Sequence, residues 1–265
     1  MPYRRNALLL LALTAIWALN ATADVAPCDR PLRVAMSSMP DARLTDDTPI
    51  RHMLDELMPE WSRRADASLV LQPMPRVRAF SELKAGSIDI VPMATRAPER
   101  DAYAELVVMG RMKAMLIVRK DAATMPGSET ELLASRLRVI LVRGQEFGSH
   151  WAAIQAELQR HGRLDIVGDQ LAAVRMLKVH RADAVFGLPV FFAPALSAEG
   201  LSDTVSIVDA KLAEPTDEGF YVSRALPAAC RARLQEAGTS LRRSGIYQSL
   251  LSRYMPPDDR AAFTD

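Results

Sequence analysis

The chain has 265 residues, 49% of them hydrophobic and 25% charged, which is enough for one large domain or two lobes with a sizeable core. Its 33 basic and 32 acidic residues give a formal net charge of +1, so no broadly basic face is implied and nucleic acid is a poor candidate partner. Beyond the N-terminus, no apolar run is long enough to span a bilayer, so we expect a soluble mature protein.

Residues 1–23 have the three-part pattern of a secretory signal peptide. Arg4–Arg5 give a positive start, residues 7–19 form an uncharged apolar run, and 21–23 supply the small residues that signal peptidase requires. A membrane anchor is the alternative, but this run is shorter than the roughly 20 residues that cross a bilayer core. We therefore predict cleavage before Asp24 and export to the periplasm.

The predicted mature chain contains two cysteines, Cys28 and Cys230. In an oxidising compartment an isolated pair is naturally read as one disulfide, and the alternative is two buried free thiols. Pro27 directly before Cys28 argues against a lipid-attachment site, which needs a small residue there.

The rest of the chain alternates strand and helix signals. The clearest helix signal covers residues 49–64, where apolar residues recur at spacings of three and four, Thr48 is a suitable N-cap and Pro49 takes the first helical position. The first half predicts strands at 32–36, 69–71, 88–93 and 115–118, helices at 49–64 and 77–85, and a helical turn at 98–106. The second half predicts strands at 138–142, 164–167, 183–186 and 220–222, and helices at 129–136, 149–160, 170–179, 228–242 and 247–254. Strands that alternate with helices imply parallel sheets with helical crossovers.

One weak internal repeat supports two similar lobes. Residues 83–91 and 177–185 share Leu, Lys, Asp and Val at the same four places. In both copies a predicted helix ends, the chain turns, and Asp89 or Asp183 opens an apolar strand. Two tandem α/β lobes would produce this pattern.

Four stretches, in this order, are typical of one known family. They are the opening strand at 32–35, the run at 83–100, the unit at 177–186, and a tail with Ser223-Arg224, Leu226-Pro227 and Gly245-Ile246-Tyr247. Together they resemble the periplasmic solute-binding proteins of family 3, the amino-acid-type receptors of ABC uptake transporters. The resemblance implies a type II periplasmic-binding-protein-like α/β fold: two lobes, each a mostly parallel sheet flanked by helices, with a ligand cleft between them.

The family layout implies that the chain starts in lobe 1, crosses to lobe 2 and returns. Lobe 1 would comprise residues 24–111 and 216–265 and lobe 2 residues 112–215, with hinge strands near 109–112 and 213–219. Both cysteines would then lie in lobe 1. The implied function is capture of a small-molecule solute by lobe closure and its delivery to the membrane permease of an ABC transporter. We expect a monomer without catalysis, cofactor or metal.

Arg100 matches the family position whose guanidinium holds the ligand's α-carboxylate. A planar guanidinium makes two parallel charge-assisted hydrogen bonds to a carboxylate, and Thr95 on the same loop matches a hydroxyl position. The alternative for Arg100 is an exposed arginine in the first turn of a helix. Arg96 lies nearby in the sequence and is expected to point the other way.

Further ligand contacts are expected at other strand ends of both lobes. The residues expected there are Ser37, Ser38 and Met39 after the first strand, and Gly144, Gln145 and Glu146 in a lobe 2 loop. A glycine-flanked loop between a strand and a helix exposes backbone N–H groups suited to an anion. The alternative is an ordinary strand-to-helix turn that does not contact the ligand.

The sequence departs from the family where amino-acid receptors hold the ligand's ammonium group. Those receptors place an Asp just after the second-lobe strand, and Leu188 stands at the matching position here. The stretch after Ser38 also lacks the aromatic residue that often covers the ligand. A carboxylate without an ammonium, or a larger solute, therefore fits better than a standard α-amino acid. Phe191 and Phe192 are candidates to line such a cleft, with burial in the core as the alternative.

Two other functions remain open. Dehydratases that act on prephenate-like acids resemble these receptors and use cleft carboxylates for proton transfer, for which Glu99 and Glu146 are the obvious acids here. A ligand sensor that reports to a separate signalling partner is the other. Metal-dependent or serine-nucleophile chemistry is not indicated, because the four histidines lack metal-ligand spacing and no G-x-S-x-G elbow is present.

Overall fold

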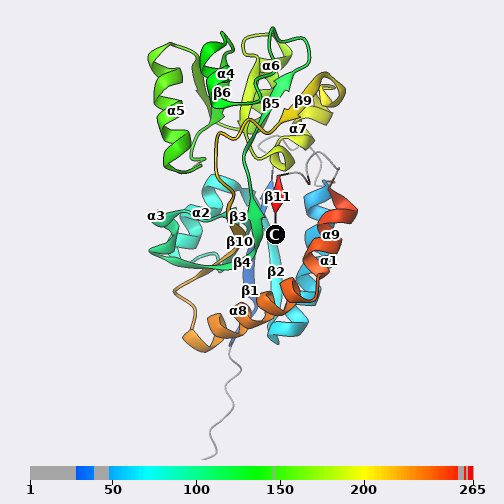
Figure 1. Cartoon of the computed structure of the whole chain (residues 1–265). Helices are drawn as coiled ribbons and strands as arrows, with labels where there is room; N and C mark the ends of the chain where they lie inside the picture. Colours follow the sequence, from blue (N-terminus) through cyan, green and yellow to red (C-terminus); the bar gives the residue numbers. More distant parts are fainter. Residues whose placement is uncertain (1–27, 39–47, 146, 256–259, 261, 265) are drawn as a thin grey trace, which may run out of the picture.

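The computed structural model describes residues 28–38, 48–145, 147–255, 260 and 262–264 (Figure 1). The predicted signal peptide lies outside these residues, as do Met39 and Glu146. The described chain forms two lobes, one above the other in Figure 1, each with its own sheet and its own helices. The two-lobed α/β architecture predicted from the sequence is confirmed.

Lobe 1, the lower lobe in Figure 1, holds the N-terminal strands and the C-terminal helices, whereas lobe 2 holds the middle of the chain. The lobe 1 sheet has the order β11-β4-β10-β3-β1-β2, with bounds β1 Leu32–Ser38, β2 Leu69–Pro75, β3 Ile90–Thr95, β4 Ala104–Met112, β10 Thr216–Ser223 and β11 Phe263–Thr264. The lobe 2 sheet has the order β7-β6-β8-β5-β9, with bounds β5 Met115–Arg119, β6 Val139–Val142, β7 Leu164–Val167, β8 Ala184–Gly187 and β9 Val205–Val208.

Most strands of each sheet run toward the other lobe. β1 pairs in parallel with β2 and β3, and β6 pairs in parallel with β7 and β8. The strand that enters each lobe from the other one runs the opposite way. For that reason β10 is antiparallel to β3 and β4, and β5 is antiparallel to β8 and β9.

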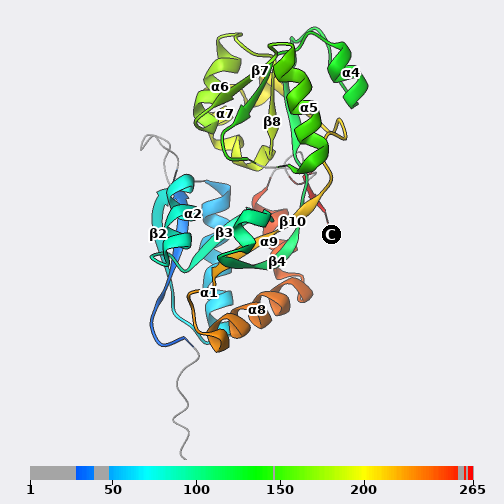
Figure 2. The same cartoon turned by 90° about the vertical axis from the view of Figure 1, so that its left-hand side faces the viewer.

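Helices cover the faces of both sheets. Lobe 1 carries α1 Pro49–Ala65, α2 Arg76–Ala85, α3 Pro98–Asp101, α8 Ala228–Arg243 and α9 Ile246–Tyr254. Lobe 2 carries α4 Glu129–Ala134, α5 Gly148–Arg160, α6 Gln170–Lys178, α7 Ala193–Ala198 and the 3₁₀ turns η1 Pro189–Phe191 and η2 Ser202–Thr204. Figure 2 shows α6 and α7 on one side of the lobe 2 sheet and α5 on the other. Among the described residues, no helix has the length and apolar character needed to cross a membrane.

The local signals of α1 are confirmed. Thr48 accepts a hydrogen bond from the backbone N–H of Arg51 at 3.2 Å, and Pro49 begins the helix. The apolar stripe faces the core, where Trp61 is fully buried and donates its indole N–H to the carbonyl of Leu234 in α8 at 3.1 Å. One face of α1 therefore joins the β-sheet to the C-terminal helices.

The prediction of a helical turn over residues 98–106 is only partly correct. α3 ends at Asp101, and β4 begins at Ala104 and continues through Val107 and Val108. β4 pairs with β10 along its whole length, and β10 lies more than 100 residues further along the chain. Long-range pairing of this kind overrides local propensity, and it explains why β4 was expected only near 109–112, as a hinge strand, and why β9 and β11 were missed.

The internal repeat corresponds to one hydrogen-bond pattern that occurs once in each lobe. In lobe 1, Asp89 accepts from the backbone N–H of Arg33 at 2.8 Å, donates its own N–H to the Arg33 carbonyl at 3.0 Å, and accepts at its carbonyl from Ser223 at 2.8 Å. In lobe 2, Asp183 makes the same three bonds with Arg138 and Arg119, at 2.8, 2.9 and 2.9 Å. Each aspartate therefore joins three adjacent strands: β1, β3 and β10 in lobe 1, and β6, β8 and β5 in lobe 2. The bonds lie where the two parallel strands of each set begin.

In lobe 1 this aspartate is also the centre of an ion-pair cluster. The Asp89 side chain is 2% exposed and accepts from the guanidinium groups of Arg30 and Arg33 at 2.7–3.1 Å. Burial alone would raise the pKa of Asp89, but the hydrogen bonds from Arg30 and Arg33 outweigh burial and hold the pKa well below its usual range. The N-terminal segment is thereby attached to the far end of lobe 1.

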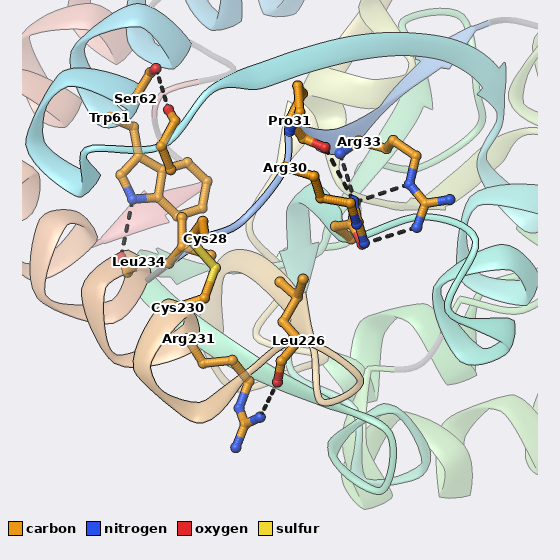
Figure 3. The surroundings of a disulfide bond; sticks show 12 residues. Cys28, Arg30, Pro31, Arg33, Trp61, Ser62, Leu226, Cys230, Arg231 and Leu234 are labelled. Carbon is orange, nitrogen blue, oxygen red and sulfur yellow. Dashed lines mark hydrogen bonds and ion pairs between the residues drawn. A yellow bond between two sulfur atoms is a disulfide. The ribbon is translucent and has the colours of Figure 1, made fainter. Parts of the chain in front are cut away.

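The predicted disulfide between Cys28 and Cys230 is present. It joins the N-terminal segment to the first turn of α8, with a Cα–Cα distance of 4.9 Å across 202 positions of sequence (Figure 3). Figure 3 also shows the hydrogen bond from Trp61 to Leu234 beside it. The disulfide and the Arg30–Asp89 pair therefore anchor the same segment at two neighbouring points.

Two connections join the lobes. The first is the pair Lys113–Ala114 between β4 and β5, and the second covers residues 209–215 between β9 and β10. The Lys113 ammonium pairs with the Asp209 carboxylate at 2.5 Å, so the two connections are joined by an ion pair. The backbone N–H of Lys113 also donates to the carbonyl of Ala262 at 2.7 Å, which places the C-terminal segment beside the first connection.

We predict that Asp89→Asn lowers the free energy of unfolding by about 3 kcal/mol at pH 7, because two arginines lose the buried carboxylate that offsets their charge. Both arginines are partly exposed, so the loss falls at the low end of the range for buried ion pairs. Urea unfolding followed by tryptophan fluorescence measures it. Asp183→Asn is the matched control and should lose only about 1 kcal/mol. Equal losses would contradict a special role for the arginine cluster.

We predict that the double variant Cys28→Ser/Cys230→Ser loses about 2–4 kcal/mol of unfolding free energy, because the link no longer constrains the unfolded chain. The urea midpoint of the wild-type protein in a reducing agent should fall to that of the variant. The variant itself should not respond to the reducing agent. A wild-type midpoint that is insensitive to reduction would show that the disulfide does not stabilise the fold.

Candidate functional site

A cavity of about 510 Å³ lies between the lobes and is lined by both of them. Its lobe 1 wall comes from the ends of β1 and β2, from β3, and from the starts of α1, α2 and α3. Its lobe 2 wall comes from the loops after β6 and β7 and from the segment 190–194. The carboxyl ends of parallel strands thus face the cavity from both sides, which is where α/β sheets bind ligands.

Arg100 occupies the lobe 1 wall in a fixed position. Its side chain is 13% exposed, and its guanidinium carbon lies 4.0 Å from the centre of the Phe80 ring. Nη1 donates to the carbonyl of Thr95 at 3.2 Å, and Nε lies 3.7 Å from a carboxylate oxygen of Glu99, whose side chain is 60% exposed. A cation held against an aromatic face at a cavity wall is well placed to receive an anion.

The loop that carries Arg100 is supported from beneath by Tyr221 of β10. The Tyr221 hydroxyl accepts from the backbone N–H of Ala97 at 2.9 Å and donates to the Asp101 carboxylate at 3.0 Å. Arg96 pairs with Asp101 at 3.1 Å and with Asp217 at 3.2 Å, away from the cavity lining. Arg96 and Arg100 therefore have different roles, and only Arg100 lines the cavity.

Arg76 is a second cavity-lining arginine that the sequence analysis did not select. It begins α2 immediately after β2, and its guanidinium donates to the carbonyl of Met93 at 2.8 Å. Its guanidinium carbon lies 5.1 Å from the ring centres of both Phe80 in lobe 1 and Phe191 in lobe 2. Burial, and next the charge of Arg100, lower the pKa of Arg76 to about 9.

Lobe 2 lines the cavity with residues of the loops after β6 and β7 and of the segment after β8. Gly144 and Gln145 line the cavity, and Gly144 has a φ of 78°, which a glycine adopts without strain. The Oε1 atom of Gln145 is buried without a hydrogen-bond partner among the described residues. Asp169 also lines the cavity, but its carboxylate accepts from the backbone N–H of Ala172 at 2.8 Å and so caps α6.

The expected ligand residues fall into three groups. Arg100, Gly144 and Gln145 come together around the cavity. Thr95 is not among the lining residues, and what it supplies is the main-chain carbonyl that holds Arg100. Ser37 and Ser38 end β1, where their backbone pairs with Met74 and Pro75, while Met39 and Glu146 lie outside the described residues.

The segment after β8 divides between core and cavity. Leu188 is 5% exposed and belongs to the hydrophobic core, and it is not among the lining residues. Phe192 is fully buried, and its ring lies so near Gly187 that a Cβ atom there would approach it to 2.7 Å. Phe191 faces the cavity. No acid stands at the position of Leu188 to receive an ammonium group.

Beneath the cavity wall lies a buried carboxyl group. Glu218 of β10 is fully buried, and its Oε1 accepts a hydrogen bond from the hydroxyl of Tyr247. Oε2 has no partner among the described residues. Burial raises the pKa of Glu218 to about 7, and the Tyr247 hydrogen bond opposes only part of that effect. The Tyr247 hydroxyl also lies 3.4 Å from the sulfur of Met93, which lines the cavity.

Comparison with known proteins identifies the fold. No protein-family description matches the chain, and no curated protein sequence matches it. Solved structures do match. The arginine-, lysine-, histidine-binding protein ArtJ from Geobacillus stearothermophilus superposes with a TM-score of 0.65 at 13% identity, covering 87% of this chain and 99% of that one. A histidine kinase sensor domain with similarity to periplasmic binding proteins gives 0.63 at 17%, covering 85% and 96%.

A third match is an ancestral amino acid-binding protein described as a precursor of cyclohexadienyl dehydratase. It gives a TM-score of 0.61 at 18% identity and covers 85% of this chain and 95% of that one. These identities are low, but the matches extend over nearly all of each structure. The chain therefore has the two-lobed fold of the periplasmic binding proteins, with the cavity at the interface between the lobes.

We predict that the stability of the protein falls as pH rises from about 5 to 7, because Glu218 is protonated in the folded state at a pH where the unfolded chain has lost that proton. The pKa difference between about 7 and the ordinary 4.5 corresponds to about 3 kcal/mol at most. Urea unfolding at several pH values measures the slope. Glu218→Gln should remove it, whereas Glu236→Gln, at an exposed position of α8, should leave it unchanged. An unchanged slope in Glu218→Gln would assign the pH dependence elsewhere.

Proposed function

We propose that this chain is a periplasmic solute-binding protein that captures a small carboxylate-bearing solute by lobe closure and delivers it to the membrane permease of an ABC transporter. The observation that carries the proposal is Arg100, a nearly buried guanidinium fixed against Phe80 in the wall of the interlobe cavity. A cavity between two lobes allows closure to enclose the solute, and closure is a change that a membrane partner can detect.

The composition of the cavity favours a carboxylate over an amino acid. Glu99 and Asp169 are the acids among the described lining residues. Glu99 is largely exposed beside Arg100, and Asp169 caps α6, so neither carboxylate is placed to receive an ammonium group. An α-amino acid requires an acid for its ammonium as well as an arginine for its carboxylate. The lining supplies the arginine and a mostly apolar surface, which suits an acid without an ammonium group.

Two of the structural matches support alternative functions. The dehydratase-precursor match supports an enzyme on the same fold, and the sensor-domain match supports a ligand sensor for a separate signalling partner. An enzyme needs a cleft acid to transfer a proton, and it would convert an added ring acid to a product. A binding protein would return the same compound unchanged, so mass spectrometry of the recovered ligand separates the two.

A thermal-shift screen tests the proposed ligand class. Carboxylates, amino acids, polyamines and sugars are added in turn to the purified mature chain. A compound that binds only the folded protein raises the melting temperature by mass action. Stabilisation by carboxylates supports the proposal, whereas stabilisation by polyamines or sugars alone would replace it.

We predict that Arg100→Ala weakens binding of the carboxylate found in that screen by roughly 30-fold to several-thousand-fold, because truncation leaves a desolvated anion without its partner. Arg100→Lys should recover only part of the affinity, since an ammonium lacks the planar two-point contact. Calorimetry gives both dissociation constants. Arg96→Ala removes a neighbouring arginine outside the lining and should bind as the wild type does. A folded Arg100→Ala protein with unchanged affinity would remove Arg100 from the site.

A further inference from the structure

Two of the lobe 1 arginines that line the interlobe cavity lie against the same aromatic ring. Arg100 comes from α3 and Arg76 from the start of α2, and both line the cavity. Their guanidinium carbons lie 4.0 and 5.1 Å from the centre of the same Phe80 ring. The two groups can therefore be no further apart than those two distances combined, which brings two positive charges within reach of one small molecule.

The position of Arg76 is set by the protein. Its guanidinium donates to the carbonyls of Met93 and Pro92 in β3, at 2.8 and 3.5 Å, and it lies 5.1 Å from the ring centre of Phe191 in lobe 2. The first turn of α2, a helix that is described in full, carries no acidic residue. No carboxylate in that turn offsets the positive end of the helix dipole, which therefore adds to the positive potential around Arg76. Arg76 is thus a fixed charge that contacts both walls of the cavity.

The described lining residues carry more positive than negative charge. They include four arginines, Arg51, Arg76, Arg100 and Arg143, and two acids, Glu99 and Asp169. Arg51 pairs with Asp55 at 2.9 Å. Of the two acids, Glu99 is largely exposed beside Arg100 and Asp169 caps α6. The neighbouring Arg100 contributes to the lowered pKa of Arg76, so like charges oppose each other in this wall. One carboxylate would offset only part of that repulsion.

The surface near the two arginines suits a hydrocarbon spacer. Met36, Leu54, Met93, Val190 and Phe191 line the same cavity. Two separate planar forks match two separate carboxylates better than one compact anion, because each fork can make its own two-point contact. An apolar segment between the two acids would then lie against these side chains.

We propose that the cleft selects dicarboxylates, with Arg100 binding one carboxylate and Arg76 the other. This inference rests on the proposed function and adds to it a ligand class and a second anchoring residue. Arg76 supplies the charge that distinguishes a dicarboxylate from a monocarboxylate, and Arg100 binds both kinds of acid.

The test compares acids of matched length by calorimetry on the purified mature chain. Succinate is compared with butyrate, and glutarate with pentanoate, while inorganic phosphate serves as a compact dianion. At least one dicarboxylate should bind the wild type about 10- to 100-fold more tightly than its matched monocarboxylate. In Arg76→Gln that preference should fall to within about 2-fold, because the dicarboxylate loses far more affinity than its matched monocarboxylate. Arg76→Lys, which keeps the charge, should keep part of the preference.

Arg233→Gln is the control for removing one positive charge elsewhere, since Arg233 is exposed on α8. It should keep the full preference. Monocarboxylates that bind the wild type as tightly as dicarboxylates, or phosphate that binds more tightly than either dicarboxylate, would overturn the inference and leave the proposed function standing. Equal weakening of both kinds of acid in Arg76→Gln would also overturn it. A wild type that binds no carboxylate of any kind would overturn the inference and the proposed function together.

Discussion

The fold depends on one aspartate in each lobe that ties together the starts of the two parallel strands beside it. Asp89 and Asp183 bond both the N–H and the carbonyl of the residue that faces them, and each also accepts from a third strand. These hydrogen bonds fix the end of each sheet where the parallel strands begin. The loops at the opposite, carboxyl ends of the strands are the ones that can vary. The cavity opens between those carboxyl ends, at the opposite end of each sheet from the two aspartates.

Local sequence patterns predicted the elements whose signals are themselves local. α1 has its cap, its proline and its buried stripe within the helix, and the repeat around Asp89 and Asp183 reported a real structural equivalence. β4 was expected only near 109–112, as a hinge strand implied by the family layout, because its pairing with β10 joins segments that are far apart in sequence. No window of neighbouring residues contains that information, and a strand of mixed polarity gives a weak signal alone.

The candidate site shows the same division. Arg100 could be selected because it matches the family position that holds a carboxylate, and Gly144 and Gln145 because they lie in a recognisable strand-to-helix loop. Arg76 directly follows β2, which was an available signal, but the predicted helix begins at Val77 and Arg76 was not among the expected ligand residues. Its shared position with Arg100 over Phe80 depends on the packing of α2 against β3, and packing is not readable from the sequence. The burial of Leu188 likewise depends on how lobe 2 packs.

The disulfide gives the chain a different connectivity from that of a linear polymer. Cys28 and Cys230 close a covalent ring, and all of lobe 2 and both connections between the lobes lie within it. A single protease cut in the mostly exposed turn at residues 120–125 would open that ring without releasing either fragment. The two walls of the cavity would remain one covalent body. In a chain without the link, the same cut would leave the fragments held only by non-covalent contacts.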